Sequence, residues 1–175
     1  MLEESQLYQE TRDLHHACEQ HIVGAGMSDG TIPEEYWVDW LFALYYIHLA
    51  IDHEVHPLMR RTNELEKDVK ECSVIPIVND KAMDFHFELE TDPQLRLAAQ
   101  YVVTGAHLMG GAITKKRIGD RLPTHHLQFE DRSSLVKIWK PLRDRTDLTQ
   151  PARRVFQMLL EIMDEIVENR NDFER

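Results

Sequence analysis

Hydrophobic residues recur along this chain at helical spacing. In residues 5–22, Leu7, Leu14, Cys18 and Ile22 fall near one stripe of a helical wheel. The positions between them are mostly polar or charged. This pattern predicts an amphipathic helix whose apolar stripe faces a core.

The next segment carries helix-breaking and then helix-starting signals. Residues 24–30 contain three glycines and predict a break. Thr31 has the position of an N-cap, with Pro33 and Glu34 placed as in the first turn of a helix. The helix that follows is long and strongly apolar and ends near Pro57. We therefore expect it to lie at the centre of the fold.

The rest of the chain shows the same period. The predicted segments are a polar surface helix and loop over 59–72, a buried connector over 73–78, a helix over 80–90, a glycine-containing helix capped by Asp92, a loop with His125, a helix over 135–142, a turn over 148–151 and a terminal helix from Ala152. In the helix over 80–90, Met83 and Phe87 are expected to face inward, with Phe85 as a further candidate. No segment alternates with period two, so the predicted fold class is all-α, a compact single-domain bundle over residues 1–175.

The stretch 101–113 is the most unusual of these helices, because it contains three glycines. Each glycine costs a helix roughly 0.5–1 kcal/mol relative to alanine. At 100° per residue, Val103, His107, Gly110 and Gly111 fall on one side. The glycines are explained either by tight packing between helices or by a flat ligand that lies against the backbone.

Composition and charge narrow the classes of function. The net charge of −11 argues against a nucleic-acid or anionic-membrane surface. No apolar run is long enough to span a bilayer, and residues 1–5 lack the pattern of a signal peptide. The two cysteines, Cys18 and Cys72, are not in a CxxC pair and suggest reduced thiols. We expect a cytoplasmic protein.

Histidine is the residue type that points most directly to chemistry. His125 and His126 stand in a polar segment and are expected to be solvated. His48, Asp52 and His56 follow one another at i, i+4, which is a metal-ligand spacing but a weak signal alone. We expect His53 and His56 to be structural and leave the role of His48 open.

Four stretches, taken in order, resemble the haem oxygenase family. They are residues 11–19, 41–54, 101–113, and 137–149 together with the terminal helix. The first is similar to the family's first helix, in which a histidine binds the haem iron, and His15 has that position with Glu19 at the family's spacing. The third resembles the helix whose glycines let backbone lie on the opposite face of the porphyrin.

The resemblance implies a fold, a reaction and partners. The fold is the helical bundle of that family, and the reaction is oxidative opening of haem to biliverdin, carbon monoxide and iron. Haem is then both substrate and prosthetic group, and its iron is held by His15. Oxygen and an electron donor such as ferredoxin or a flavin reductase are the implied partners.

The resemblance also implies a set of haem contacts. On the glycine-containing helix, Ala106, Gly110 and Gly111 would let the backbone close on the disc. Haem carries two carboxylates at one edge, which require basic or hydroxyl groups at a rim. The candidates for these propionate contacts are Arg12, Tyr101, Lys137 and Lys140.

Two positions depart from the family's pattern. Many members carry an aspartate where this chain has His107, and a tyrosine where it has His48. In the family that pair organises the waters that supply protons, so His107 and His48 are the expected catalytic residues.

Two alternatives remain open at this point. One is a haem carrier or sensor of the same fold in which His107 ligates iron. The other is a helical oxidase with a non-haem metal, held by some of His48, Asp52, His53, Glu19 and His107.

Overall fold

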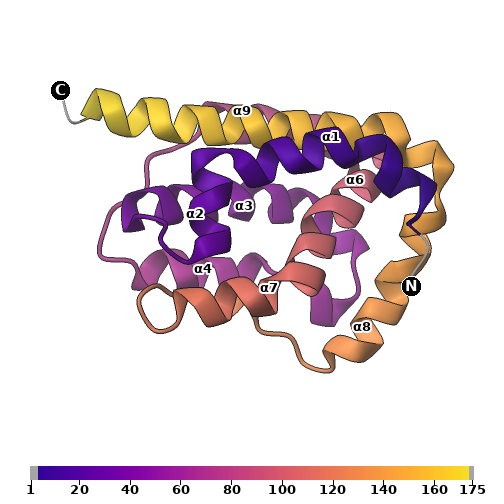
Figure 1. Ribbon diagram of the computed structural model, residues 1–175, viewed down its shortest axis with the longest axis horizontal. Coiled ribbons are helices and arrows are strands. Elements are labelled where there is room, and N and C mark those ends of the chain that lie inside the picture. The colour runs from indigo at the N-terminus through magenta and orange to yellow at the C-terminus, as the bar shows by residue number, and fades with distance from the viewer. Residues whose placement is uncertain (1–3, 174–175) are drawn as a thin grey trace.

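The computed structural model describes residues 4–173, and every regular element in that range is helical (Figure 1). The predicted all-α class is thereby confirmed. Residues 1–3 and 174–175 lie outside the described part, including most of the segment on which the expected lack of a signal peptide rests. The α-helices are α1 (Gln6–Gln20), α2 (Ile22–Asp29), α3 (Glu34–Ile51), α4 (Thr62–Glu71), α5 (Asp80–Thr91), α6 (Pro93–Ala99), α7 (Gly105–Ile118), α8 (Arg132–Trp139) and α9 (Thr149–Phe173).

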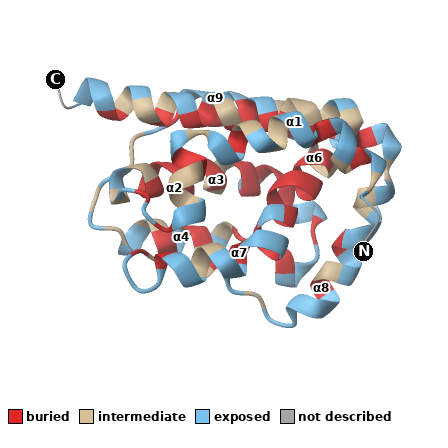
Figure 2. Cartoon of the chain, in the orientation of Figure 1, coloured by how far each residue is buried: buried red, intermediate tan, exposed pale blue. Residues whose placement is uncertain are grey.

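Helix α3 lies at the centre, as its apolar sequence predicted. It packs against α4, α5 and α9, and its buried side chains include Trp37, Leu41 and Ile47. Helix α9 runs along one edge of the molecule with α1 beside it (Figure 1). Figure 2 shows that the buried residues of α9 lie mainly along its side turned toward the rest of the bundle. No helix among the described residues has both the length and the apolar content needed to cross a membrane.

The predicted break over 24–30 is wrong, because that segment forms α2 and the chain bends instead at His21. A Cβ on Gly24 would stand 1.9 Å from the carbonyl oxygen of Cys18. Glycine is therefore needed where α2 meets α1, and it serves close packing there. The predicted cap at Thr31 is also wrong: Pro33 holds the N-cap position of α3 without a side-chain hydrogen bond.

Three smaller predictions are wrong as well. The connector over 73–78 is not buried, since Ile75 is 83% exposed. In α5, Phe85 faces the core, as was allowed, but Phe87 is 58% exposed and does not face inward as expected. Helix α9 begins at Thr149 within the expected turn.

Short irregular helices complete the chain and place the loops around the core. The 3₁₀ segments are Asp52–Glu54, Pro57–Met59, His125–Leu127, Lys140–Asp144 and Thr146–Leu148, and a π-helical turn spans Gln100–Thr104. The π-helical turn joins α6 to α7 without a break and adds one residue to the helical turn. It thereby changes the direction in which the side chains of α7 point. A regular helical period of 3.6 residues per turn does not predict this change.

Candidate functional site

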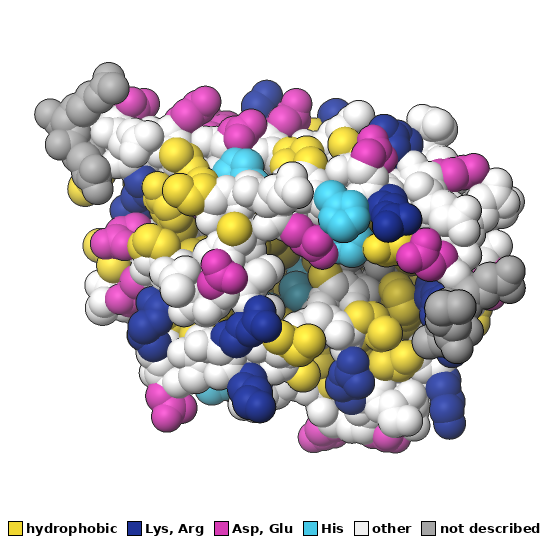
Figure 3. All heavy atoms as spheres, in the orientation of Figure 1, with side chains coloured by type: hydrophobic (Ala, Val, Ile, Leu, Met, Phe, Trp, Pro, Cys, Tyr) yellow, Lys and Arg dark blue, Asp and Glu magenta, His cyan; other side chains and the backbone are white. Residues whose placement is uncertain are grey.

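A cavity of about 500 Å³ opens between α1 and α7. Its size falls in the range of small-molecule sites. Figure 3 shows this hollow on one face of the molecule, with histidine at its edge and hydrophobic side chains inside. The lining is mostly apolar or aromatic and includes Tyr8, Cys18, Met27, Trp37, Trp40, Leu44, Tyr101, Trp139, Phe156 and Met163. Three histidines, His15, His107 and His126, are its ionisable nitrogen groups.

Helix α1 supplies His15 to one wall. The imidazole stacks on Phe156 with ring centroids 5.5 Å apart and meets the edge of Tyr8 at 5.9 Å. Its Nε2 lies 3.0 Å from the Oε1 of Glu19, one turn further along the helix. Both residues line the cavity, whereas His16 is exposed and does not. The structure therefore brings His15 and Glu19 together at the cavity and turns His16 away.

The glycines of α7 have different surroundings. A Cβ on Gly105 would stand 2.5 Å from Cζ2 of Trp139, and one on Gly111 would stand 3.0 Å from a methyl carbon of Leu127. A Cβ on Gly110 would meet nothing within 4 Å. Ala106 and Gly110 are exposed and line the cavity. Tight packing thus accounts for Gly105 and Gly111, and open space toward the cavity is what distinguishes Gly110.

His107 and His48 form a buried pair on the wall opposite to His15's helix. Their Nε2 atoms lie 3.2 Å apart and their rings stack at 5.3 Å. His48 is fully buried, and its Nδ1 lies 2.8 Å from Oδ1 of Asp52. The Nδ1–H of His48 donates to that carboxylate, so the two Nε2 atoms share one proton between them. His107 has no partner for its Nδ1 among residues 4–173.

Burial and hydrogen bonds determine the charges of Asp52 and His107. Burial would raise the pKa of Asp52, but hydrogen bonds from His48 and Thr62 lower it overall. Burial lowers the pKa of His107 well below 6.5, and the nearby His126, His48 and Arg61 lower it further. His107 is therefore an uncharged imidazole at neutral pH, and Asp52 is an anion held by several donors.

His126 is a cavity residue that the sequence analysis missed. It was expected to be solvated, but it is 1% exposed and lines the cavity. Its Nδ1 lies 2.6 Å from Oδ2 of Asp68, and its ring meets the edge of His107 at 5.2 Å. Burial lowers its pKa, and the bond to Asp68 offsets only part of that effect. The polar residues around His126 could not reveal that its loop packs against α7.

The low pKa of His107 predicts acid sensitivity of the ligand-free protein. Folding keeps His107 uncharged, whereas in the unfolded chain it takes up a proton near pH 6.5. The free energy of unfolding should therefore fall as pH drops below about 6.5, with a slope that approaches 1.4 kcal/mol per pH unit for this one group. His126 adds to the slope in the same direction.

Urea denaturation at several pH values between 7 and 5 measures this slope. His107→Phe, which keeps an aromatic ring and removes the titrating group, should flatten it. An unchanged slope in that variant would mean that His107 is not the residue held uncharged.

The predicted propionate contacts are not all at the cavity. Tyr101 lines it and stacks on Trp139 at 5.8 Å. Arg12 has a side chain that is 55% exposed and lies 3.7 Å from Glu4. Lys137 and Lys140 are exposed, and none of the three cations belongs to the lining. Their role stays a prediction.

Arg143 is a cation near Tyr101 that the sequence analysis did not consider. Burial raises the pKa of the Tyr101 phenol, and the charge of Arg143 offsets part of that rise. Arg143 is half-buried, and no ion pair involves it within residues 4–173. In the sequence it follows Trp139 and is close to Lys137 and Lys140, the two lysines proposed from the family resemblance.

The ligand set of a non-haem metal site is not assembled. Among the described residues, no group of three or more His, Cys, Asp or Glu side chains is placed to hold a metal ion. His53 is exposed at the surface, and Glu19 contacts His15 and His16. Cys18 lines the cavity, but burial raises the pKa of its thiol to about 12, so it is not a thiolate at neutral pH.

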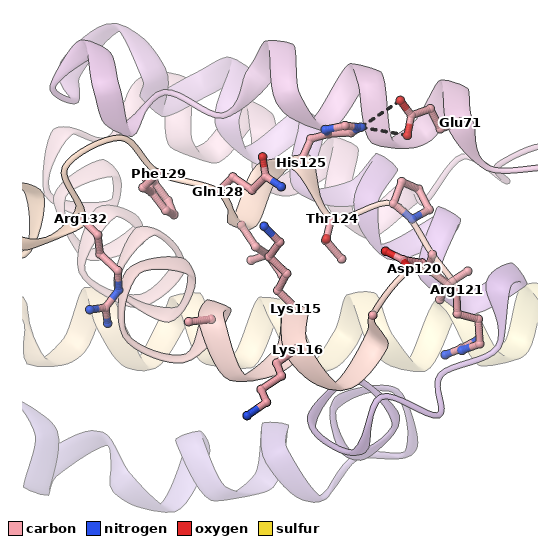
Figure 4. A pocket seen from close by; sticks show the side chains of 15 residues that line it. Glu71, Lys115, Lys116, Asp120, Arg121, Thr124, His125, Gln128, Phe129 and Arg132 are labelled. Carbon is pink, nitrogen blue, oxygen red and sulfur yellow. Dashed lines mark hydrogen bonds and ion pairs between the residues drawn. The ribbon is translucent and has the colours of Figure 1, made fainter.

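A larger hollow of about 960 Å³ lies on the other side of Leu127, which borders both cavities. Figure 4 shows Lys115 pointing into it and Lys116 pointing away. His125 is paired with Glu71 at 2.9 Å, and Arg121 and Arg132 donate to backbone carbonyl oxygens. Four of its polar residues are thus paired within the protein. The histidine-lined cavity, with its mostly apolar lining, is the stronger candidate for an apolar ligand.

Solved structures with the same fold are haem oxygenases. Haem oxygenase-1 of the cyanobacterium Synechocystis, in complex with haem, superposes with a TM-score of 0.79 and 17% identity, over 94% of this chain and 91% of that one. Haem oxygenase-2 of Synechocystis, with haem and NO, gives 0.78 and 19%, over 92% and 83%. The enzyme of Leptospira interrogans gives 0.77 and 20%, over 91% and 97%. No family model and no curated protein sequence matches the chain. This chain has the haem oxygenase fold.

Proposed function

We propose that this protein is a haem oxygenase, which cleaves haem to biliverdin, carbon monoxide and iron with oxygen and an external electron donor. One observation carries the proposal. A single apolar cavity has His15 on one wall and, on another, an open glycine beside buried histidines. A flat apolar disc with a central metal needs such an arrangement. The haem-containing neighbours of the same fold support it.

Each wall has a distinct task in this proposal. His15 provides the axial nitrogen. Its contact with Glu19 is half-exposed, and a contact of this kind contributes at most about 1 kcal/mol, so it does not bar ligation. Gly110 and Ala106 leave room for the porphyrin face. We assign a propionate contact to Tyr101, which lines the cavity, and to Arg143, whose charge acts on the Tyr101 phenol. Arg12, Lys137 and Lys140 remain further candidates for that contact.

When bound, haem supplies the iron that activates oxygen and the carbon bridge that is oxidised. The protein's contribution on the opposite wall is proton handling. His107 is tied to His48 through Nε2, so its Nδ1 is the atom available to hold a water in the cavity. Asp52 fixes the proton of His48 on Nδ1, so the proton of the 3.2 Å contact belongs to Nε2 of His107. The bare Nδ1 of His107 would then accept a hydrogen bond from that water and orient it.

Haemin titration tests the proposal. The purified protein should show a stoichiometric Soret band. With oxygen and reduced ferredoxin or a flavin reductase, the complex should release carbon monoxide and biliverdin. Absence of the Soret band would refute the proposal, and a stable complex that does not turn over would favour a carrier or sensor. The choice of donor and a cytoplasmic location remain predictions.

The role of His107 distinguishes a haem oxygenase from a haem carrier. Since its Nε2 is engaged by His48, we expect it to hold water and not to ligate iron. His107→Ala should keep haem affinity and the axial histidine signature while turnover falls, by roughly 10²-fold if it is part of the proton supply. Electron paramagnetic resonance of the ferric complex is the measurement. A wild-type signal of two histidine ligands that disappears in His107→Ala would contradict this role and indicate a carrier.

A further inference from the structure

The loop that carries His126 is held by contacts with two buried charged residues, Asp68 and Arg61. Asp68 on α4 accepts hydrogen bonds from the backbone N–H of His125 at 2.7 Å, from the backbone N–H of His126 at 3.0 Å, and from the Nδ1–H of His126 at 2.6 Å. Both Asp68 and His126 are buried, so these charge-assisted bonds form away from water. One carboxylate thus fixes both the backbone and the ring of His126.

A buried cation fixes the same loop from the other side. Arg61 donates through Nη1 to the carbonyl oxygens of His126 at 3.4 Å and Gln128 at 2.6 Å. Its guanidinium stands 4.1 Å from the ring centre of Phe129. Burying a charge is costly unless it is well hydrogen-bonded. The buried charges of Asp68 and Arg61 therefore both hold this short loop in position.

The result of these contacts is the orientation of one imidazole. Because the Nδ1–H of His126 is donated to Asp68, the proton of the uncharged ring is on Nδ1 and Nε2 is a bare acceptor. This Nε2 has no hydrogen-bond partner among the described residues, and the ring lines the histidine-lined cavity beside His107. A histidine that served only the core would need no access to a cavity.

We propose that His126 is a positioning residue of this cavity: its Nε2 accepts a hydrogen bond from a water and turns the second O–H of that water toward the bound ligand. The inference rests on the proposed function, in which the ligand is haem. It adds a second imidazole, anchored by Asp68, to the one anchored by Asp52 through His48. The charged and titratable groups around His126 are Asp68 on α4, Arg61 before it, His48 on α3 and His107 on α7.

Three variants separate this role from a structural one. His126→Phe keeps an aromatic ring and leaves Asp68 its two backbone donors, so the fold should be retained. His126→Gln restores an acceptor near the position of Nε2. His125→Ala is the matched control, because it removes the adjacent imidazole, which is paired with Glu71 outside this cavity. Circular dichroism and thermal unfolding of each ligand-free variant check the fold.

The haem complex provides two readouts that a structural residue would not move. His126→Phe should bind haem within about twofold of wild type, lower turnover by about tenfold or more and change its pH profile. It should also shift the infrared stretching band of carbon monoxide added to the reduced complex. His126→Gln should recover part of both effects, and His125→Ala should change neither. Wild-type turnover and an unchanged band in His126→Phe would overturn the proposal.

A measurement on the ligand-free protein keeps this inference separate from the proposed function. Imidazole ¹H–¹⁵N correlation spectra should show His126 protonated at Nδ1 and bare at Nε2. A proton on Nε2 would overturn the inference, whether or not haem binds. Failure of the wild-type protein to bind haem would refute the proposed function, while the tautomer would still decide whether His126 presents an acceptor to the cavity.

Discussion

His15→Ala should remove the axial nitrogen ligand from the ferric haem complex, and His16→Ala should leave it in place. The two residues are adjacent, but helix geometry turns them about 100° apart. Only His15 lines the cavity, where Phe156 and Tyr8 support its ring. We expect haem affinity of His15→Ala to fall at least tenfold, because an apolar cavity without an iron ligand retains only the burial of the porphyrin.

Absorption and electron paramagnetic resonance spectra of the three ferric complexes measure the ligand. Imidazole added to His15→Ala should restore the axial nitrogen signature, which separates loss of a ligand from loss of the fold. If His16→Ala loses the signature and His15→Ala keeps it, the assignment is wrong. The comparison is well matched, since both variants remove an imidazole from the same exposed turn of α1.

The helical spacing of apolar residues was sufficient to predict the all-α architecture. The apolar pattern that follows Thr31 and ends near Pro57 predicted a central helix. Burial of Trp37 and Ile47 in α3 confirms that position, although α3 ends earlier, at Ile51. Asp92 was predicted as a helix cap, and its side chain accepts from Leu95 N at 3.1 Å. These predictions succeeded because caps and apolar stripes are local properties of the chain.

Long-range contacts account for what the sequence could not predict. The segment 24–30 was taken for a break because glycines usually disrupt helices, but Gly24 is required by the approach of α1 to α2. His126 and Asp68 are 58 residues apart and meet only in the folded protein. A wheel drawn at 100° per residue grouped Gly110 with Gly111, but a Cβ on Gly111 would meet Leu127 at 3.0 Å, whereas one on Gly110 would meet nothing within 4 Å.

The glycines of α7 give the last prediction, which compares a substitution against the packed core with one that faces the cavity. Gly105→Ala places a methyl group 2.5 Å from a ring carbon of Trp139 in the core. Overpacking of this kind costs roughly 1–3 kcal/mol, against a gain in helix propensity of about 1 kcal/mol. Gly105→Ala should therefore leave stability unchanged or lower the free energy of unfolding by up to about 2 kcal/mol.

Gly110→Leu should raise the stability of the protein and weaken ligand binding. No atom lies within 4 Å of the position of its Cβ, so the fold accepts the side chain, and the free energy of unfolding should rise by roughly 0.5–1 kcal/mol through helix propensity. The same side chain would occupy space beside Ala106 in the cavity, and haem affinity should fall at least tenfold. Haemin titration and urea denaturation of both variants provide the test, with Gly110→Ala as the smaller control. A Gly110→Leu variant that is as stable as expected yet binds haem like wild type would show that haem does not lie against α7. The site would then have to be built from other walls of the cavity.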